Sequence, residues 1–279
     1  MAFGQMKPGA KISLVALGAL AALVILTMSL RGTLTRPFIF PAPNYRFTPA
    51  LPGGKMLSVR GERTAYGYYA KAGKRLVVFF HGNGEVMGSM QDLVAMMLAQ
   101  GMSVLLAEYP GYGYAAAHTA SEANLYADSQ RLLETVQRDY QHRKEDTLLW
   151  GFSLGTGVAV EMAARGLGGS ALLMAPFTSM VELAEKHFTP LARLLVVDRF
   201  DSAAKASTIQ LPVLLVHGDR DQVIPISQAR SLAGLFKNSQ LLEVAGADHN
   251  DLAALMSKEA WKSVTEFALK GSLPAAKSR

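Results

Sequence analysis

A serine between two glycines marks one point of this chain where chemistry could take place. The stretch LLWGFSLGTG, residues 148–157, passes from an apolar run through the pattern G-x-S-x-G, centred on Ser153, into small residues. Glycines around a serine permit a tight turn from a strand into a helix, and this turn presents the hydroxyl as a nucleophile. The plainer interpretation of Ser153 is a small residue in a tight turn, so its chemistry depends on partners elsewhere.

A nucleophilic serine needs a base, and the base needs a carboxylate that fixes its tautomer. Two later apolar runs supply both residue types: VLLVH leads into GDRDQVIP, with Asp219 and Asp221, and QLLEV leads into AGADHND, with His249. The order serine, aspartate, histidine is the order that accompanies such a turn. Either aspartate could be the acid, and Asp219 could instead hydrogen-bond the local backbone. His81 and His217 precede glycines at strand ends and are expected to brace loops.

The oxyanion that forms on serine attack needs two preorganised N–H donors. One is expected from Leu154, which follows the serine at a helix N-terminus, where the helix dipole also helps. The other is expected from the loop HGNGE after the run LVVFF, because its glycines let the backbone turn its amides inward. The N–H of Asn83 is the candidate, with Gly82 as the second choice. The loop lacks the G-K-[ST] ending of a phosphate-binding loop.

A parallel sheet is expected to position these residues. Continuous apolar runs alternate with helix-like stretches, as in a sheet that is covered by helices on both faces. The runs are 76–80, 104–108, 147–150, 171–175, 213–217 and 240–244, and helices are expected near 90–100, 121–140, 156–166, 225–236 and 258–269. This order predicts a doubly wound α/β domain, with functional residues at the carboxyl ends of the strands. KMLSVRG and TAYGYYAK predict an antiparallel hairpin ahead of it. Thr119 and Glu122 have the spacing of a capping box.

The composition fits one large globular domain. The chain has 279 residues, of which 50% are hydrophobic and 18% charged, and this supports a substantial core. It contains no cysteine, which excludes disulfides and thiolate metal sites. The net charge is +6, but the basic residues are scattered and do not form the clustered patch of a nucleic-acid-binding protein. No nucleic-acid partner is expected, and an attraction to anionic lipid headgroups fits the charge better.

The N-terminal segment differs from the rest of the chain. Residues 12–30, ISLVALGALAALVILTMSL, carry no charge and lie between Lys7 and Lys11 on one side and Arg31 and Arg36 on the other. A helix of this length spans a bilayer core of about 30 Å. A cleaved signal peptide and a buried helix are the alternatives, but no small-x-small cleavage site follows. The segment therefore predicts a transmembrane helix, and its balanced flanking charges leave the side of the membrane undecided.

Three regions follow from this pattern. Residues 1–31 are expected to form a membrane anchor, so that the protein is a single-pass membrane protein. Residues 32–54, rich in proline, glycine and aromatics, are expected to form an irregular tether. Residues 55–279 are expected to form the folded domain.

Six stretches in order, FFHGNGE, EYPGYG, WGFSLGTG, PFTS, LPVLLVHGDRDQVIP and GADHND, closely resemble the α/β-hydrolase superfamily. The anchor and RPFIFPAP are similar to its single-pass membrane-anchored serine hydrolases, and the resemblance covers residues 36–255. In the acid motif of this family the carboxylate lies four positions after a strand-end histidine, here His217, which selects Asp221 over Asp219. The resemblance thus implies a nucleophile, acid and base at Ser153, Asp221 and His249, with oxyanion amides at Leu154 and Asn83.

The resemblance implies an α/β-hydrolase fold and a serine hydrolase that forms an acyl-enzyme on Ser153 without a metal or organic cofactor. Residues 176–212 are too few for a large lid, but the amphipathic stretch 181–200 could form a small cap or pack on the sheet. Esters or thioesters of apolar acyl groups are the expected substrates. An aminopeptidase or amidase of the same fold is one alternative, and a membrane-tethered binding module without turnover is the other.

Overall fold

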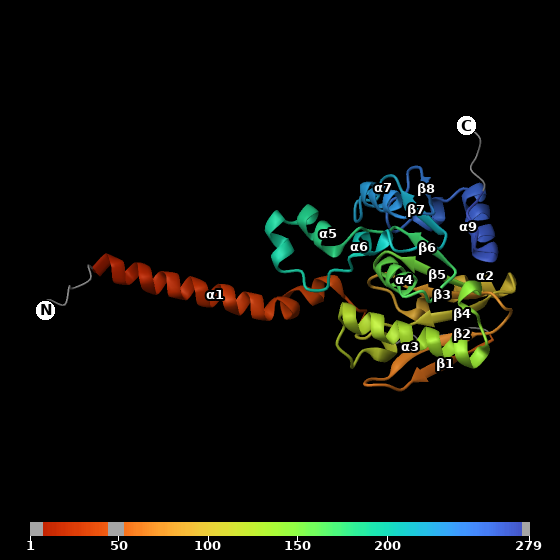
Figure 1. Ribbon diagram of the computed structural model, residues 1–279, viewed down its shortest axis with the longest axis horizontal. Helices are drawn as coiled ribbons and strands as arrows, with labels where there is room; N and C mark the ends of the chain where they lie inside the picture. Colours follow the sequence, from red (N-terminus) through yellow and green to blue (C-terminus); the bar gives the residue numbers. More distant parts are fainter. Residues whose placement is uncertain (1–7, 44–52, 275–279) are drawn as a thin grey trace.

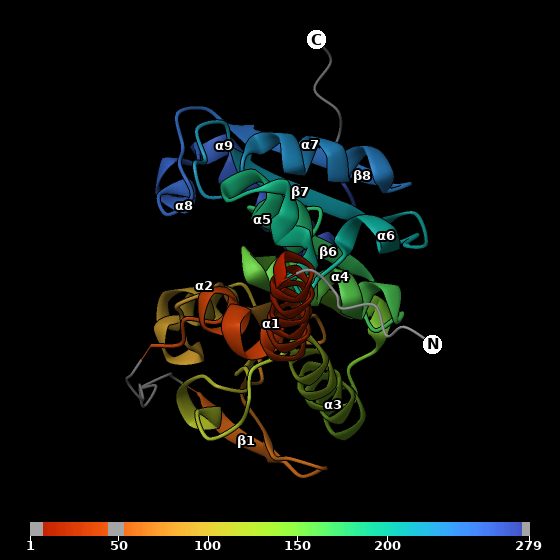
Figure 2. The ribbon, with the colours of Figure 1, turned by 90° about the vertical axis from the view of Figure 1, so that its left-hand side faces the viewer.

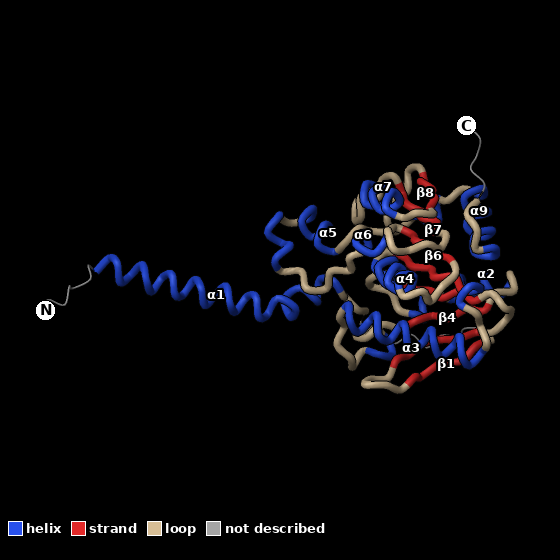
Figure 3. Tube along the Cα trace, viewed as in Figure 1, coloured by secondary structure: helices blue, strands red, loops and turns tan. Residues whose placement is uncertain are grey.

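An eight-stranded sheet forms the centre of the molecule. The computed structural model describes residues 8–43 and 53–274. The strands lie in the order β1-β2-β4-β3-β5-β6-β7-β8, stacked from bottom to top in Figure 3. They are β1 Gly54–Val59, β2 Ala65–Ala70, β3 Leu76–Phe80, β4 Ser103–Ala107, β5 Thr147–Phe152, β6 Ser170–Met174, β7 Val213–Gly218 and β8 Ser239–Val244. β2 pairs antiparallel with β1 and β4, and the other pairs are parallel. The predicted mostly parallel sheet and its hairpin are confirmed.

Helices cover both faces of this sheet (Figure 1). They are α2 Gln91–Ala99, α3 Glu122–Tyr140, α4 Leu154–Ala164, α5 Met180–His187, α6 Ser202–Ala206, α7 Ile226–Leu235, α8 Leu252–Leu255 and α9 Lys258–Lys270. Successive strand residues point to opposite faces. Leu76, Val78 and Phe80 of β3 join a core with α3, α4, α6 and α7. Val77 and Phe79 join a second core with α2, α8 and α9. The predicted two-faced α/β domain is therefore confirmed.

The chain changes direction across the sheet at β3, which lies between β4 and β5. α2 follows β3 and packs on one face, whereas α4 follows β5 and packs on the other. The loops at the carboxyl ends of β3 and β5 therefore leave in opposite directions and open a crevice between them. Such a switch point is where α/β folds bind ligands.

The N-terminal helix α1, Pro8–Ile39, contains the predicted membrane span and projects from the domain (Figure 1). In the portion of the chain that the structure describes, no helix combines the length and the apolar character that a membrane crossing requires. The predicted transmembrane helix is therefore not confirmed.

Part of the predicted tether is helical instead of irregular, because α1 continues to Ile39. Tertiary contacts stabilise this end of the helix: Arg36 forms an ion pair with Asp198 at 2.9 Å. Phe40, directly after the helix, is buried in the core, where its ring lies 6.1 Å from that of Phe200. Figure 2, which looks along α1, shows it in front of α4 and α5. The later tether, residues 44–52, lies outside the described residues.

The helix α3 begins two residues later than the predicted capping box implies. Its N-cap is Ser121, whose hydroxyl accepts a hydrogen bond from the N–H of Asn124 at 3.2 Å. The prediction of Thr119 as the cap is wrong. Glu122 instead accepts the N–H of Arg199 at 2.6 Å, so this helix end is tied to the segment between β6 and β7. The local pattern could not indicate this partner, because it lies far away in the sequence.

Candidate active site

Ser153 occupies a sharp turn between β5 and α4. Its backbone has φ 51° and ψ −118°, a conformation that non-glycine residues rarely adopt and that is found at functional sites. The two glycines of the motif allow the turn to pack. A Cβ atom on Gly155 would lie 2.0 Å from the carbonyl oxygen of Phe80, and one on Gly151 would lie 2.4 Å from the carbonyl oxygen of Gly155. The G-x-S-x-G pattern is thus required by close approach of the backbone.

The structure brings Ser153, His249 and Asp221 together. Nε2 of His249 lies 2.9 Å from Oγ of Ser153, and Nδ1 lies 2.7 Å from Oδ2 of Asp221. A carboxylate can only accept, so Nδ1 carries the proton and Nε2 is left to accept the serine hydroxyl. Each of the three residues is 7% exposed, which shields the hydrogen bonds from water. The arrangement can remove a proton from Ser153.

The carboxylate of Asp221 is held by several donors. The N–H groups of Val223 and Ile224 donate to its Oδ1 at 2.9 and 2.7 Å. Burial alone would raise the pKa of Asp221, but the hydrogen bonds from His217, His249 and Ile224 together hold this pKa well below its ordinary value. Asp221 therefore stays ionised and can stabilise a positive charge on His249.

Asp219 lies outside this network. Its Oδ1 accepts the N–H of Gly246 at 2.6 Å, and its side chain is exposed. This is the local turn role that the sequence left open for it. His217, in contrast, does more than brace a loop, because its Nε2 lies 3.2 Å from Oδ2 of Asp221. Their spacing of four residues was the available signal for this contact.

The two candidate oxyanion amides come from different elements that line the same cavity as Ser153. Leu154 is the first residue of α4, and Asn83 lies in the loop after β3. Within the described residues, no acceptor occupies either N–H, whereas the N–H of Gly82 donates to Oε2 of Glu85 at 2.6 Å. The second choice, Gly82, is therefore already engaged, and Asn83 remains the candidate.

Two tyrosines of the EYPGYG stretch hold the loop after β3. The hydroxyl of Tyr112 donates to Oδ1 of Asn83 at 2.8 Å, and that of Tyr109 donates to the carbonyl oxygen of His81 at 2.9 Å. Burial and the nearby charge of Glu108 raise the pKa of Tyr112 well above its ordinary value. Tyr112 therefore remains protonated, and so a hydrogen-bond donor, at neutral pH. The sequence contained these tyrosines but no sign of their role.

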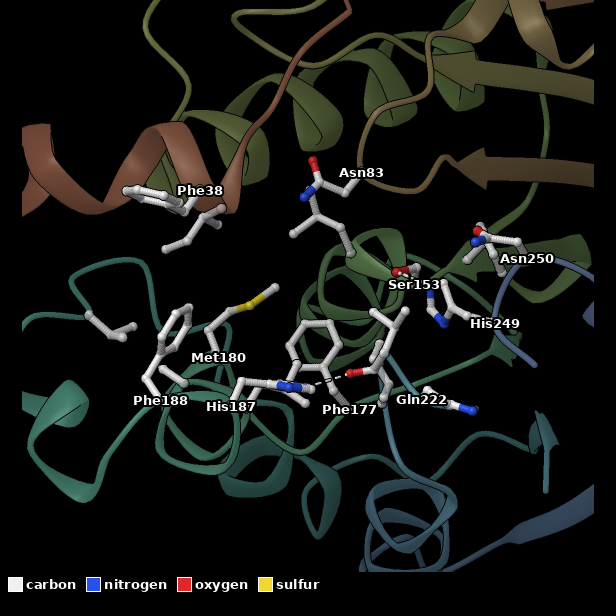
Figure 4. A pocket seen from close by; sticks show the side chains of 18 of the residues that line it. Phe38, Asn83, Ser153, Phe177, Met180, His187, Phe188, Gln222, His249 and Asn250 are labelled. Atoms are coloured by element: carbon white, nitrogen blue, oxygen red, sulfur yellow. Dashed lines mark hydrogen bonds between the residues drawn. The ribbon is translucent and has the colours of Figure 1, made fainter. Parts of the chain in front are cut away.

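Ser153 lines a cavity of about 730 Å³ (Figure 4). Its walls come from the end of α1, the loop after β3, the helix α5, and the loops after β7 and β8. Phe38, Phe177, Met180 and Phe188 supply apolar surface across from Ser153. The stretch 181–200, which was expected to form a cap or to pack on the sheet, forms α5 and a 3₁₀ turn, Pro190–Leu194, and α5 lines this cavity. Among the described residues, no group of three or more His, Asp or Glu side chains is arranged to hold a metal ion.

Two family models match consecutive parts of the chain. The family described as "Serine aminopeptidase, S33" matches residues 71–203, and the family described as "TAP-like protein" matches residues 196–279. "Alpha/beta hydrolase domain-containing protein 17B" of Xenopus laevis is 32% identical over 200 residues, which cover 69% of this chain and 67% of the relative. The chain spans 62% to 67% of the length of the curated relatives of this name.

Solved structures share the fold. The Pyrococcus furiosus esterase PF2001 superposes with a TM-score of 0.66 at 17% identity, covering 83% of this chain and 96% of the esterase. A Mycobacterium tuberculosis puromycin-hydrolyzing peptidase superposes with a TM-score of 0.67 at 16% identity, covering 84% of this chain and 41% of the peptidase. At such identities the likeness concerns the fold alone. With its sheet order, its serine turn and its relatives taken together, the chain belongs to the α/β-hydrolase superfamily.

Proposed function

We propose that the protein hydrolyses carboxylic esters or thioesters of apolar acyl groups through an acyl-enzyme on Ser153. The observation that carries this proposal is the hydrogen bond from Ser153 to His249, 2.9 Å long, at the floor of a largely apolar cavity. Activation of the hydroxyl by a neighbouring imidazole is what nucleophilic catalysis by serine requires. The membership of the chain in a superfamily of hydrolases agrees with this chemistry.

The reaction proceeds in two steps. Oγ of Ser153 bonds to the carbonyl carbon while its proton passes to Nε2 of His249, and the N–H groups of Leu154 and Asn83 stabilise the oxyanion. The bond to the leaving oxygen or sulfur then breaks, and the leaving atom takes the proton from His249. Water next attacks the acyl-enzyme, gives a proton to His249 and releases the acid, and Ser153 recovers its proton. Asp221 stays ionised throughout and stabilises the imidazolium.

The cavity favours an apolar acyl group. Phe177, Met180 and Leu183 line it beyond the serine, and Phe38 of α1 and Phe188, directly after α5, complete its far side. Burial of each methylene group contributes about 0.8 kcal/mol to binding. A medium or long acyl chain thus gains affinity there, whereas a charged or strongly polar group loses its hydration.

An aminopeptidase or amidase remains the second candidate, because one carboxylate borders the cavity. Glu85 lines it together with Ser153, and its Oε2 already accepts the N–H of Gly82. The other carboxylate oxygen could bind a free amine. In that case Glu85→Gln would abolish cleavage of aminoacyl p-nitroanilides, whereas an ester hydrolase for apolar acyl groups would not cleave these compounds at a useful rate.

The location we propose is a lipid surface, which the protein contacts through α1. The helix exposes a series of large apolar side chains, namely Leu20, Leu23, Val24, Ile25, Leu26, Leu30, Leu34 and Phe38. Its last residues also line the cavity, so a bound membrane would lie close to the entrance. Flotation of the full chain with vesicles of phosphatidylcholine and phosphatidylglycerol tests this, and flotation is expected to fall when Ile25 and Leu26 are both replaced by Glu. Equal flotation of the two proteins would remove the proposal.

Labelling with a fluorophosphonate tests the catalytic proposal. The full chain is expected to label, and Ser153→Ala and His249→Ala are expected to lose labelling while their circular dichroism and melting temperatures stay close to those of the wild type. p-Nitrophenyl esters and acyl-thioesters of increasing chain length then give the acyl preference. A folded wild type that fails to label would instead indicate the membrane-tethered binding module without turnover.

A further inference from the structure

A second cavity, of about 410 Å³, adjoins the first on the side of the candidate base. Its walls come from α2, β3, β5 and the segment around α8 and α9. Most of them are apolar or aromatic: Phe79, Met90, Leu93, Met96, Trp150, Phe152, Met174, Leu252 and Trp261. The acyl group proposed above occupies the first cavity and leaves the second one without an assigned role.

The two cavities share only part of their walls, and this indicates what each one holds. Glu85, Phe152, His249 and Asn250 line both, whereas Ser153, Leu154 and Asn83 line only the first. The carbonyl under attack lies against the serine and the oxyanion amides, so the acyl side belongs to the first cavity. The leaving group takes its proton from His249 and therefore departs on the side of that residue. The second cavity lies on this side.

The lining of the second cavity indicates a large leaving group. Two indole rings, two phenylalanine rings and three methionines offer an apolar surface, and methionine side chains adapt to irregular shapes. A space of this volume is much larger than methanol or ethanol needs.

We propose that the second cavity binds a bulky apolar or aromatic leaving group, so that the substrates join two apolar halves through one ester or thioester bond. The inference rests on the proposed function and adds the chemical class of the second half. In the step concerned, the carbonyl carbon–oxygen or carbon–sulfur bond breaks. The leaving atom keeps the electron pair and receives the proton from His249. No further reactant is needed.

Butyrate esters with different alcohols test the inference. At a fixed acyl group, the chain is expected to hydrolyse 2-naphthylmethyl butyrate with a kcat/KM at least about tenfold above that for ethyl butyrate, because a fitting apolar group fills the pocket. Equal values for the two esters would overturn the inference.

A matched pair of substitutions on α8 tests the location. Ala253 lines the second cavity and is exposed, whereas its neighbour Ala254 is also exposed and lines neither cavity. Ala253→Phe is expected to lower the ratio of naphthylmethyl to ethyl ester kcat/KM at least about fivefold, and Ala254→Phe is expected to leave this ratio unchanged. The half-buried Leu93 of α2 gives a second variant, Leu93→Trp, with the same expected loss.

Fluorophosphonate labelling distinguishes a failure of the proposed function from a failure of the leaving-group site. If the wild type does not label, the proposed function fails. If the wild type and the variants label equally, but the ratio is the same in Ala253→Phe, Leu93→Trp and Ala254→Phe, the second cavity does not bind the leaving group and only the further inference fails.

Discussion

His217 and Asp221 are four residues apart, and Nε2 of His217 lies 3.2 Å from the carboxylate oxygen of Asp221 that also faces His249. The same Nε2 lies 2.7 Å from the carbonyl oxygen of Ile224, so it must carry a proton to serve either acceptor. His217 is fully buried. It is therefore placed to orient the carboxylate of Asp221, the proposed acid, without touching the substrate.

Replacement of His217 is expected to disturb Asp221 and to leave substrate binding intact. His217→Leu should lower kcat by about tenfold to a hundredfold with little change in KM, because a lost hydrogen bond to a charged group costs about 1.5–3 kcal/mol. Loss of this donor also raises the pKa of Asp221, so activity should fall further at pH 5 than at pH 8. His217→Gln, which retains a donor, should recover part of the loss. A uniform loss over the whole pH range in both variants would indicate only a structural role.

The two neighbouring aspartates should differ sharply. Asp221→Asn is expected to lower kcat by about 10³-fold or more, because an amide favours the wrong tautomer of His249. Asp219→Asn should keep most of the activity, since Asp219 accepts only the N–H of Gly246 in an exposed turn. Ester hydrolysis by the two purified variants gives the comparison. Similar losses in both would contradict the choice of the acid.

The ionised Asp221 should also contribute to stability above its unfolded-state pKa, which is about 3.9. Because the folded-state pKa is lower, the unfolded chain binds the proton more readily in acid, and this contribution is lost as the pH falls through the folded-state value. Urea unfolding of the wild type and Asp221→Asn measures it. The advantage of the wild type in free energy of unfolding should be larger at pH 6 than at pH 3. An advantage that grows towards acid would contradict the direction of the shift.

Tyr112 should affect the oxyanion site through Asn83. Its hydroxyl holds the Asn83 side chain at 2.8 Å, so Tyr112→Phe should loosen the loop after β3 and lower kcat about threefold to tenfold. Because Tyr112 remains protonated, the size of the effect should not vary between pH 6 and pH 10. Stopped-flow measurement of Ser153 acylation by p-nitrophenyl esters tests this prediction. An unchanged acylation rate would show that Tyr112 does not support the oxyanion site.

Gly155 should tolerate no side chain. Gly155→Ala places a methyl group 2.0 Å from the carbonyl oxygen of Phe80, so it should destabilise the fold by about 1–3 kcal/mol and lower labelling of Ser153. Gly234, in α7, serves as the control, because a methyl group there would meet no neighbouring atom within 4 Å. Gly234→Ala should be neutral or stabilising by up to about 1 kcal/mol, because alanine favours helices. Equal melting temperatures of the two variants would contradict the packing argument.

Much of the fold could be predicted from local patterns. The continuous apolar runs indicated six of the strands with bounds correct to within two residues, and the alternation with helices indicated a sheet covered on both faces. The pattern G-x-S-x-G and the histidine after the last strand indicated Ser153 and His249. The residues alone left Asp219 and Asp221 open as the acid, and the resemblance to the α/β-hydrolase superfamily selected Asp221. Each of these patterns can be recognised from a few consecutive residues. The residues that follow different strands then meet in space, because parallel strands place their carboxyl ends at one edge of the sheet.

The sequence by itself thus determined the sheet, the serine turn and the three residues that meet there. Only the tertiary structure decided that Phe38 of α1 and the helix α5 line the first cavity, that His217 contacts Asp221 and Tyr112 donates to Asn83, and that a second cavity adjoins His249. It also showed that α1 continues into the first part of the predicted tether, as far as Ile39. These features depend on contacts between segments far apart in the chain, and the volume left between packed side chains is a property of the assembled elements that no local pattern records.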